Sequence, residues 1–72
     1  MKYSEILAMT SPELAKRLEE SREELFRLRF RLATRQLDNF RELRKTRRSI
    51  AKLLTAMRQR ELEAEEDHVG EA

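Results

Sequence analysis

The sequence predicts an all-α protein, an antiparallel two-helix hairpin preceded by a short N-terminal helical turn. Only one of the 72 residues is glycine and only one is proline, and 42% are charged, a composition typical of long helices. Apolar residues recur at alternating spacings of three and four, which places them on one helical face. A capping signal near residue 39 divides the helical stretch in two. A chain of this length forms one small domain without a deep core.

The first long helix is predicted over about residues 12–35. Ser11 can accept a hydrogen bond from a free N–H group of the first turn, and Pro12 suits the first helical position, where its missing N–H costs nothing. Glu13 then lies where the helix dipole favours an anion. Residues 4–9 are expected to form one or two turns, too short to be stable alone. The apolar stripe of the long helix contains Leu14, Leu18, Ser21, Leu25, Leu28 and Leu32.

The second helix is predicted over about residues 40–62. Asn39, with Glu42 three residues later, resembles a capping box, so a new helix is expected to begin there. The apolar stripe repeats in Leu43, Thr46, Ile50, Leu53 and Met57, and Leu54 widens it. Residues 1–62 are therefore expected to form the hairpin domain, and residues 63–72 an acidic, disordered tail.

The short connection between the two helices makes them antiparallel neighbours. One register aligns both stripes along their length, through the pairs Leu32–Leu43, Leu25–Ile50 and Leu18–Met57. The seam contains few apolar residues. The free energy gained by burying them is about equal to the conformational entropy cost of ordering the chain. We therefore expect marginal stability alone and firmer structure on a partner.

Positive charge is concentrated in the middle of the chain. Residues 27–60 contain twelve Lys or Arg and two acids, whereas the segments on either side have more acids than cations. The overall net charge of +2 conceals this separation. A basic block between acidic ends indicates a surface for a polyanion, and nucleic acid is the leading candidate.

Both helices bring cations to the end where they connect. A single charge run is usually a solvated face, but two converging basic segments with almost no acids favour a phosphate-binding surface. Arginine suits this role because its planar fork can bridge two phosphate oxygens. Structured RNA would then be recognised more by its backbone shape than by its sequence.

A second apolar stripe on the first helix, rotated away from the leucines, contains Phe26 and Phe30. These rings could pack against the N-terminal turn or fold over the loop. Alternatively, they could be buried only when another macromolecule docks. The sequence leaves both alternatives open, and the second makes Phe26 and Phe30 candidate protein-contact residues.

Catalytic and cofactor signatures are missing from the sequence. There is no cysteine, and the one histidine, His68, has no partner at metal-ligand spacing. No nucleophile–base pair or glycine-rich phosphate loop is present. We expect a protein that is not an enzyme, has no cofactor, metal or small-molecule substrate, and is cytoplasmic with no membrane contact.

Several segments together resemble the bacterial large-subunit ribosomal protein twenty-nine family, over roughly residues 2–61. They are Ser11-Pro12-Glu13-Leu14, Glu24-Leu25-Phe26-Arg27-Leu28-Arg29-Phe30, Ala33-Thr34, Gln36-Leu37-Asp38-Asn39 and Arg47-Arg48-Ser49-Ile50-Ala51-Lys52. The order of the Leu-Arg-Phe and Arg-Arg-x-Ile-Ala-Lys segments is fairly specific, whereas either alone would be weak.

The resemblance implies an antiparallel hairpin on 23S ribosomal RNA near the polypeptide exit tunnel. It also implies contact with the neighbouring large-subunit protein twenty-three, close to where nascent-chain factors dock. The RNA-facing candidates that it implies are Arg29, Gln36, Asn39, Arg44, Arg47, Arg48 and Lys52. Three positions depart from the family pattern: Arg31 replaces a common glutamine, Arg35 a common glycine, and Phe40 a small residue or proline. The first helix is therefore expected to end differently.

The sequence thus predicts a non-catalytic ribosomal RNA-binding protein of the large subunit. One rival is a free helical adapter that binds a protein through its apolar seam. Another is a hairpin that binds nucleic acid non-specifically. The net charge of +10 over residues 27–60 argues against the adapter, whose binding should survive high salt.

Overall fold

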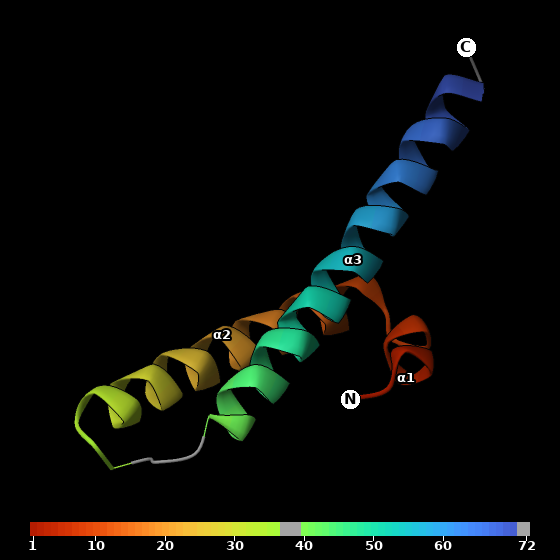
Figure 1. The fold of residues 1–72 in the computed structure, drawn as a ribbon. Helices are drawn as coiled ribbons and strands as arrows, with labels where there is room; N and C mark the ends of the chain where they lie inside the picture. Colours follow the sequence, from red (N-terminus) through yellow and green to blue (C-terminus); the bar gives the residue numbers. More distant parts are fainter. Residues whose placement is uncertain (37–39, 71–72) are drawn as a thin grey trace.

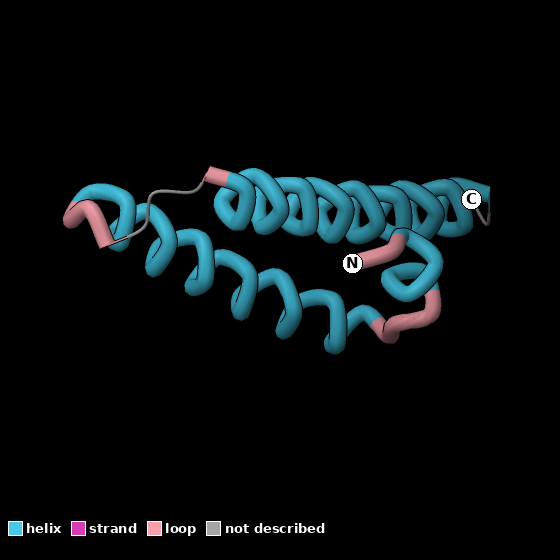
Figure 2. The backbone as a smooth tube through the Cα atoms, turned by 60° about the horizontal axis from the view of Figure 1, so that its bottom comes forward, coloured by secondary structure: helices cyan, strands magenta, loops and turns pink. Residues whose placement is uncertain are grey.

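Three helices make up the computed structural model, which describes residues 1–36 and 40–70. They are α1 (Tyr3–Leu7), α2 (Ser11–Ala33) and α3 (Arg41–Gly70). The long helices α2 and α3 run antiparallel, and α1 lies against the middle of α3 (Figures 1 and 2). The predicted all-α hairpin with a short N-terminal helix is confirmed, and no strand occurs in the described ranges. The molecule is a rod of 56 × 20 × 16 Å.

The apolar core lies where all three helices meet. Its buried residues are Ile6, Leu14, Leu18, Leu53 and Ala56. Leu28 is buried separately nearer the loop, and the other predicted seam positions are half-buried, so both predicted stripes face inward. Two differences stand out. Ile6 and Ala56 belong to the core without having been predicted, and Leu54 is 43% exposed although the sequence adds it to the stripe.

The N-terminal helix α1 is fastened to α3 by polar contacts as well as by Ile6. The Nζ atom of Lys52 donates to the carbonyl oxygen of Met1 at 3.0 Å, and the Tyr3 hydroxyl donates to Oε1 of Gln59 at 3.4 Å. Ile6 itself is fully buried, although a five-residue helix has no independent stability. The α1 helix therefore forms because α3 provides a surface for it.

The guanidinium group of Arg60 holds the segment between α1 and α2. It donates to the carbonyl oxygen of Leu7 at 3.3 Å, to that of Met9, and to Oγ of Ser11 at 3.3 Å. The Leu7 carbonyl lies at the end of α1, where it has no partner within the helix, and the Met9 carbonyl lies in the segment between α1 and α2. Arg60 is half-buried, so the hydrogen bonds are partly shielded from water. This contact, the Arg60 clamp, fixes where the chain turns from α1 into α2.

The start of α2 differs by one residue from the prediction. The cap is Thr10, whose side chain accepts a hydrogen bond from the Glu13 backbone N–H at 3.3 Å. The Glu13 carboxylate in turn accepts from the Thr10 N–H at 3.2 Å, which completes a capping box. Ser11, predicted as the cap, is the first helical residue, and its hydroxyl instead accepts from Arg60.

The end of α2 has the hydrogen-bond pattern of a Schellman motif. The N–H groups of Arg35 and Gln36 donate to the carbonyls of Leu32 (3.1 Å) and Arg31 (2.8 Å). Arg35 itself has a φ of 61°, in the left-handed region that favours glycine. The helix thus ends at Ala33, two residues before the predicted end. After Ala33 the chain takes the conformation that suits the glycine implied by the family resemblance, although Arg35 stands there.

We expect Arg35→Gly to stabilise the hairpin by about 1 kcal/mol. The left-handed conformation costs a residue with a Cβ roughly 1–2 kcal/mol, and the greater freedom of glycine in the unfolded chain offsets part of that gain. Urea denaturation followed by circular dichroism measures the change. Arg35→Ala, which keeps the Cβ, is the matched control and should not stabilise. A destabilised glycine variant would contradict the backbone conformation of Arg35.

The second long helix begins at Arg41, and the N–H of Arg44 donates to the Phe40 carbonyl at 3.0 Å in its first turn. Asn39, the predicted cap, lies outside the described residues. The predicted end near residue 62 is wrong, because α3 continues to Gly70. Residues 63–70 are therefore helical where a disordered tail is expected. The reason is that residues 61–69 contain neither glycine nor proline and include strong helix formers such as Glu, Leu and Ala.

Candidate nucleic-acid interface

Four of the predicted RNA-facing arginines lie exposed near the loop end of the hairpin. The ion pairs of the structure are Arg17–Glu20, Arg27–Glu23, Arg27–Glu24 and Arg58–Glu61. All join neighbours on one helix, and their side chains are at least half exposed, so they contribute little to stability. Among the predicted RNA-facing arginines, Arg29, Arg44, Arg47 and Arg48 belong to none of these pairs.

The predicted RNA-facing residues point in different directions around the hairpin. Arg44 and Arg48 lie one turn apart on the side of α3 away from α2, since neither is near the seam positions. In the register that the sequence predicts, which aligns Leu25 with Ile50, Arg29 on α2 and Arg47 on α3 lie on either side of the seam. Arg29 and Arg47 therefore share one face of the hairpin, whereas Arg44 and Arg48 form its outer edge.

Three further candidates have other surroundings. Lys52 donates to the Met1 carbonyl, so it lies beside α1 and away from the loop end. Gln36 directly follows α2, where its backbone N–H closes the Schellman motif and its side chain is exposed. Asn39 lies outside the described residues. The structure thus groups four arginines near the loop and separates Lys52 from them.

Arg60 is the residue whose role the sequence analysis missed. It counts there as part of the basic block, but in the structure its guanidinium group holds the α1–α2 junction. A signal was present, because Arg60 follows Met57 by three residues and Leu53 by seven, which places it on the apolar stripe of α3. An arginine at such a position covers apolar surface with its stem while its head finds polar partners.

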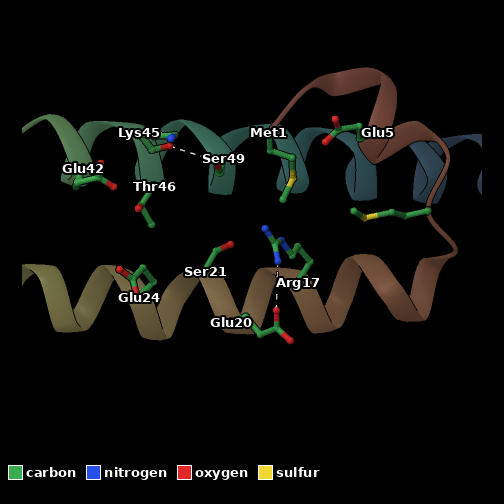
Figure 3. Close-up of a pocket in the computed structure, with 11 residues that line it drawn as sticks. Met1, Glu5, Arg17, Glu20, Ser21, Glu24, Glu42, Lys45, Thr46 and Ser49 are labelled. Carbon is green, nitrogen blue, oxygen red and sulfur yellow. Dashed lines mark hydrogen bonds and ion pairs between the residues drawn. The ribbon is translucent and has the colours of Figure 1, made fainter.

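A groove separates α2 from α3 on the side of the hairpin that carries α1. Figure 3 shows labelled side chains of both long helices and of the N-terminal segment around it. Half-buried Ser21 and Thr46 leave room there, because they are smaller than the leucines elsewhere in the seam. The charged residues that line the groove are four acids and two cations: Glu5, Glu20, Glu24, Glu42, Arg17 and Lys45. The groove on this side, the α1 face, is thus lined by more acids than cations.

The two phenylalanines of α2 are exposed. Phe26 is 71% and Phe30 is 59% accessible to solvent, and neither belongs to the core that includes α1. The alternative in which they pack the N-terminal turn is therefore wrong, since α1 rests on α3. Phe26 also lines a shallow hollow with two acids and two cations, Glu19, Glu23, Arg22 and Arg27. Protein contact by Phe26 and Phe30 stays a prediction.

The described residues offer no other kind of site. No cluster of His, Asp or Glu among them could hold a metal ion. Within the same ranges, no helix combines the length and the apolar surface that crossing a lipid bilayer demands. Exposed arginines and the exposed rings of Phe26, Phe30 and Phe40 are thus the features that could recognise a partner.

Comparison with known proteins points to one family. The family model described as ribosomal L29 protein matches residues 4–60. A protein of Nocardia farcinica named large ribosomal subunit protein uL29 is 56% identical over 59 residues, which cover 82% of this chain and 75% of that one. Proteins with the same name from Pelotomaculum thermopropionicum and Dehalococcoides mccartyi are 53% and 49% identical, covering 86% and 88% of this chain and 92% and 97% of their own. All three similarities span most of the helical hairpin.

Proposed function

Because this chain belongs to the ribosomal L29 protein family, we propose that it binds 23S ribosomal RNA near the polypeptide exit tunnel. Membership in the family makes it a structural, non-enzymatic constituent of the large ribosomal subunit, and so part of the cytoplasmic ribosome of bacteria. What we propose beyond family membership is that the protein binds 23S ribosomal RNA and that it does so near the exit tunnel. The resemblance of its loop-end segments to the family's RNA-facing segments supports both.

One observation supports RNA binding above the others: Arg29, Arg44, Arg47 and Arg48 are exposed near the loop end and belong to none of the ion pairs found in the described part of the chain. A cation already paired with a carboxylate would lose that pair on meeting a phosphate. Arg29, Arg44 and Arg47 lose nothing of this kind, so the release of counterions from RNA drives their binding. Their planar forks can each hold two phosphate oxygens.

A protein neighbour is the second part of the proposal. The exposed rings of Phe26 and Phe30 lie one turn apart on α2, away from the seam. Aromatic side chains of this kind are enriched at protein interfaces. The family resemblance suggests large-subunit protein twenty-three as the neighbour. A position beside that protein would place the hairpin close to the site where nascent-chain factors dock. Loss of cross-linking between the two proteins in a Phe26→Ala, Phe30→Ala variant would support this contact.

Co-sedimentation with large ribosomal subunits tests the proposed function. The tagged full-length chain should migrate with the subunits and leave them only as the salt of the wash rises. Binding that ignores salt would indicate a free adapter using its apolar seam. Equal binding to duplex DNA and structured RNA would indicate a non-specific nucleic-acid-binding hairpin. A chain that stays at the top of the gradient under every condition would contradict the proposal.

We expect Arg47→Ala with Arg48→Ala to weaken binding to 23S ribosomal RNA and to flatten its salt dependence. Each lost phosphate contact reduces the slope of log K against log salt concentration by about one unit. Filter binding at several salt concentrations measures both quantities. The matched control is Arg17→Ala with Arg58→Ala, because these two cations already form ion pairs. Unchanged binding by the first variant would remove Arg47 and Arg48 from the interface.

A further inference from the structure

The two broad faces of the hairpin differ in charge. On the α1 face, the groove between α2 and α3 is lined by four carboxylates and two cations (Figure 3). Glu42 lies at the loop end of this groove, and Glu24 lies on α2. Any phosphate chain laid across this face would meet these carboxylates.

The residues on the face opposite α1 can be identified from the residues that line the groove. Neighbours two residues apart on a helix lie about 200° apart around its axis, so they point to opposite sides. Lys45 lines the groove, and Arg47 therefore belongs to the other face. Arg31 follows the groove residue Glu24 by seven positions and shares its side, so Arg29 lies opposite it.

Among the described residues, the opposite face carries no acid in its loop half. On α2 it presents Arg29 and Ala33, and on α3 it presents Arg47 and Ala51, each pair spaced by four residues. The two alanines are exposed and short, so they leave the backbone of both helices open to close approach. Arg29 and Arg47 lie on either side of the seam, and neither forms an ion pair in the described ranges.

We infer that ribosomal RNA lies on the hairpin face opposite α1, held by Arg29 and Arg47, and that the α1 face is turned away from it. This inference rests on the proposed function and assigns it to one face. The occupant is the ribose-phosphate backbone of structured RNA, because two arginines with no carboxylate nearby complement a chain of phosphates. A basic protein segment would instead favour the acid-lined α1 face.

If RNA lies on the face opposite α1, two pairs of basic residues near the loop should contribute unequally to RNA affinity. Arg31 and Lys45 lie in the same turns of α2 and α3 as Arg29 and Arg47, and all four side chains are exposed. Their summed charge is the same, so a purely non-specific attraction of RNA to the loop end would use both pairs alike. Of these two pairs, a face-specific contact uses Arg29 and Arg47 and leaves Arg31 and Lys45 unused.

The test compares two charge-reversed variants of the full chain in filter binding to 23S ribosomal RNA. Arg29→Glu with Arg47→Glu should lower the affinity by about 100-fold or more at moderate salt, because repulsion replaces two phosphate contacts. Arg31→Glu with Lys45→Glu should lower it by less than about fivefold, through long-range charge alone. Equal losses from both pairs, or a larger loss from the second, would overturn the face assignment while leaving RNA binding intact.

A second pair of variants guards against unfolding. Arg31 lies in the last turn of α2, where a carboxylate opposes the helix dipole, so its reversal could weaken the helix. The neutral variants Arg29→Gln with Arg47→Gln, and Arg31→Gln with Lys45→Gln, avoid that effect and should give the same ranking with smaller losses. If the unchanged protein shows no binding to 23S ribosomal RNA, the proposed function fails, and the face assignment fails with it.

Discussion

Replacement of Leu53 by alanine is expected to remove a large part of the folding free energy of the isolated chain. Leu53 is fully buried and packs with Ile6, Leu14 and Leu18 at the only place where all three described helices meet. Truncating a buried leucine costs about 2–5 kcal/mol, from the lost transfer of its methyl groups and the cavity that remains. A domain of this size has a total stability of roughly 4–11 kcal/mol. The variant should therefore be close to unfolding at room temperature.

The next residue provides the control. Leu54 is 43% exposed and lies outside the core, so Leu54→Ala removes the same atoms from the same helix at a much smaller cost, within about 1 kcal/mol. Thermal and urea unfolding of both variants, followed by circular dichroism, gives the comparison. Equal losses would mean that the core is not centred on Leu53. Recovery of helicity when the Leu53→Ala variant binds large subunits would show that the partner supplies the missing stability.

The second large effect is expected from Arg60→Met, which keeps much of the apolar stem and removes the hydrogen bonds of the Arg60 clamp. Hydrogen bonds to a charged group contribute about 1.5–3 kcal/mol each at most, and here the carbonyls of Leu7 and Met9 also lose their partner. We expect a loss of roughly 2–3 kcal/mol for the variant as a whole. The loss should be concentrated in α1, which depends on α3 for its structure.

Hydrogen exchange of backbone amides distinguishes this local release from a general loss of stability. The Met9 N–H, which donates to the Ile6 carbonyl at 3.1 Å, should exchange much faster in Arg60→Met, whereas amides in the middle of α2 should change less. Arg58→Met is the matched control, because Arg58 is exposed and pairs only with Glu61 one turn away. Uniform acceleration across all helices, or none in α1, would contradict the clamp.

The hairpin could be predicted from the sequence because its signal is long and periodic. Leu14 to Leu32 and Leu43 to Met57 each repeat the helical spacing over several turns, and both stripes point inward in the structure. Ile6 could not be placed in the core, because a five-residue helix is too short to show a period. The choice between Thr10 and Ser11 as the cap also escaped prediction. Both hydroxyls can cap a helix, and only the reach of Arg60 to Ser11 separates their roles.

The sequence identifies which basic residues lie near the loop, but not how they are distributed around the hairpin. Composition and order identified the basic block, and the structure shows Arg29, Arg44, Arg47 and Arg48 exposed, without ion pairs in the described ranges. Their division between a face and an edge depends on how α2 and α3 are rotated about their axes. The acid-lined groove lies on the face that carries α1. No period in the sequence predicts on which face of the hairpin α1 packs. Lys52 illustrates this, because its contact with Met1 exists only once α1 has docked.

The attachment of α1 to α3 sets the timing of folding during synthesis. The contacts made by Lys52, Gln59 and Arg60 join positions 49 to 56 residues apart, so the chain through residue 60 must emerge before all of them can form. Until then Ile6 and Leu14 have no surface to cover them, and the first half of the polypeptide stays open to solvent or to chaperones. This protein should therefore acquire its tertiary structure in one step, once the chain through Arg60 has emerged from the ribosome that makes it.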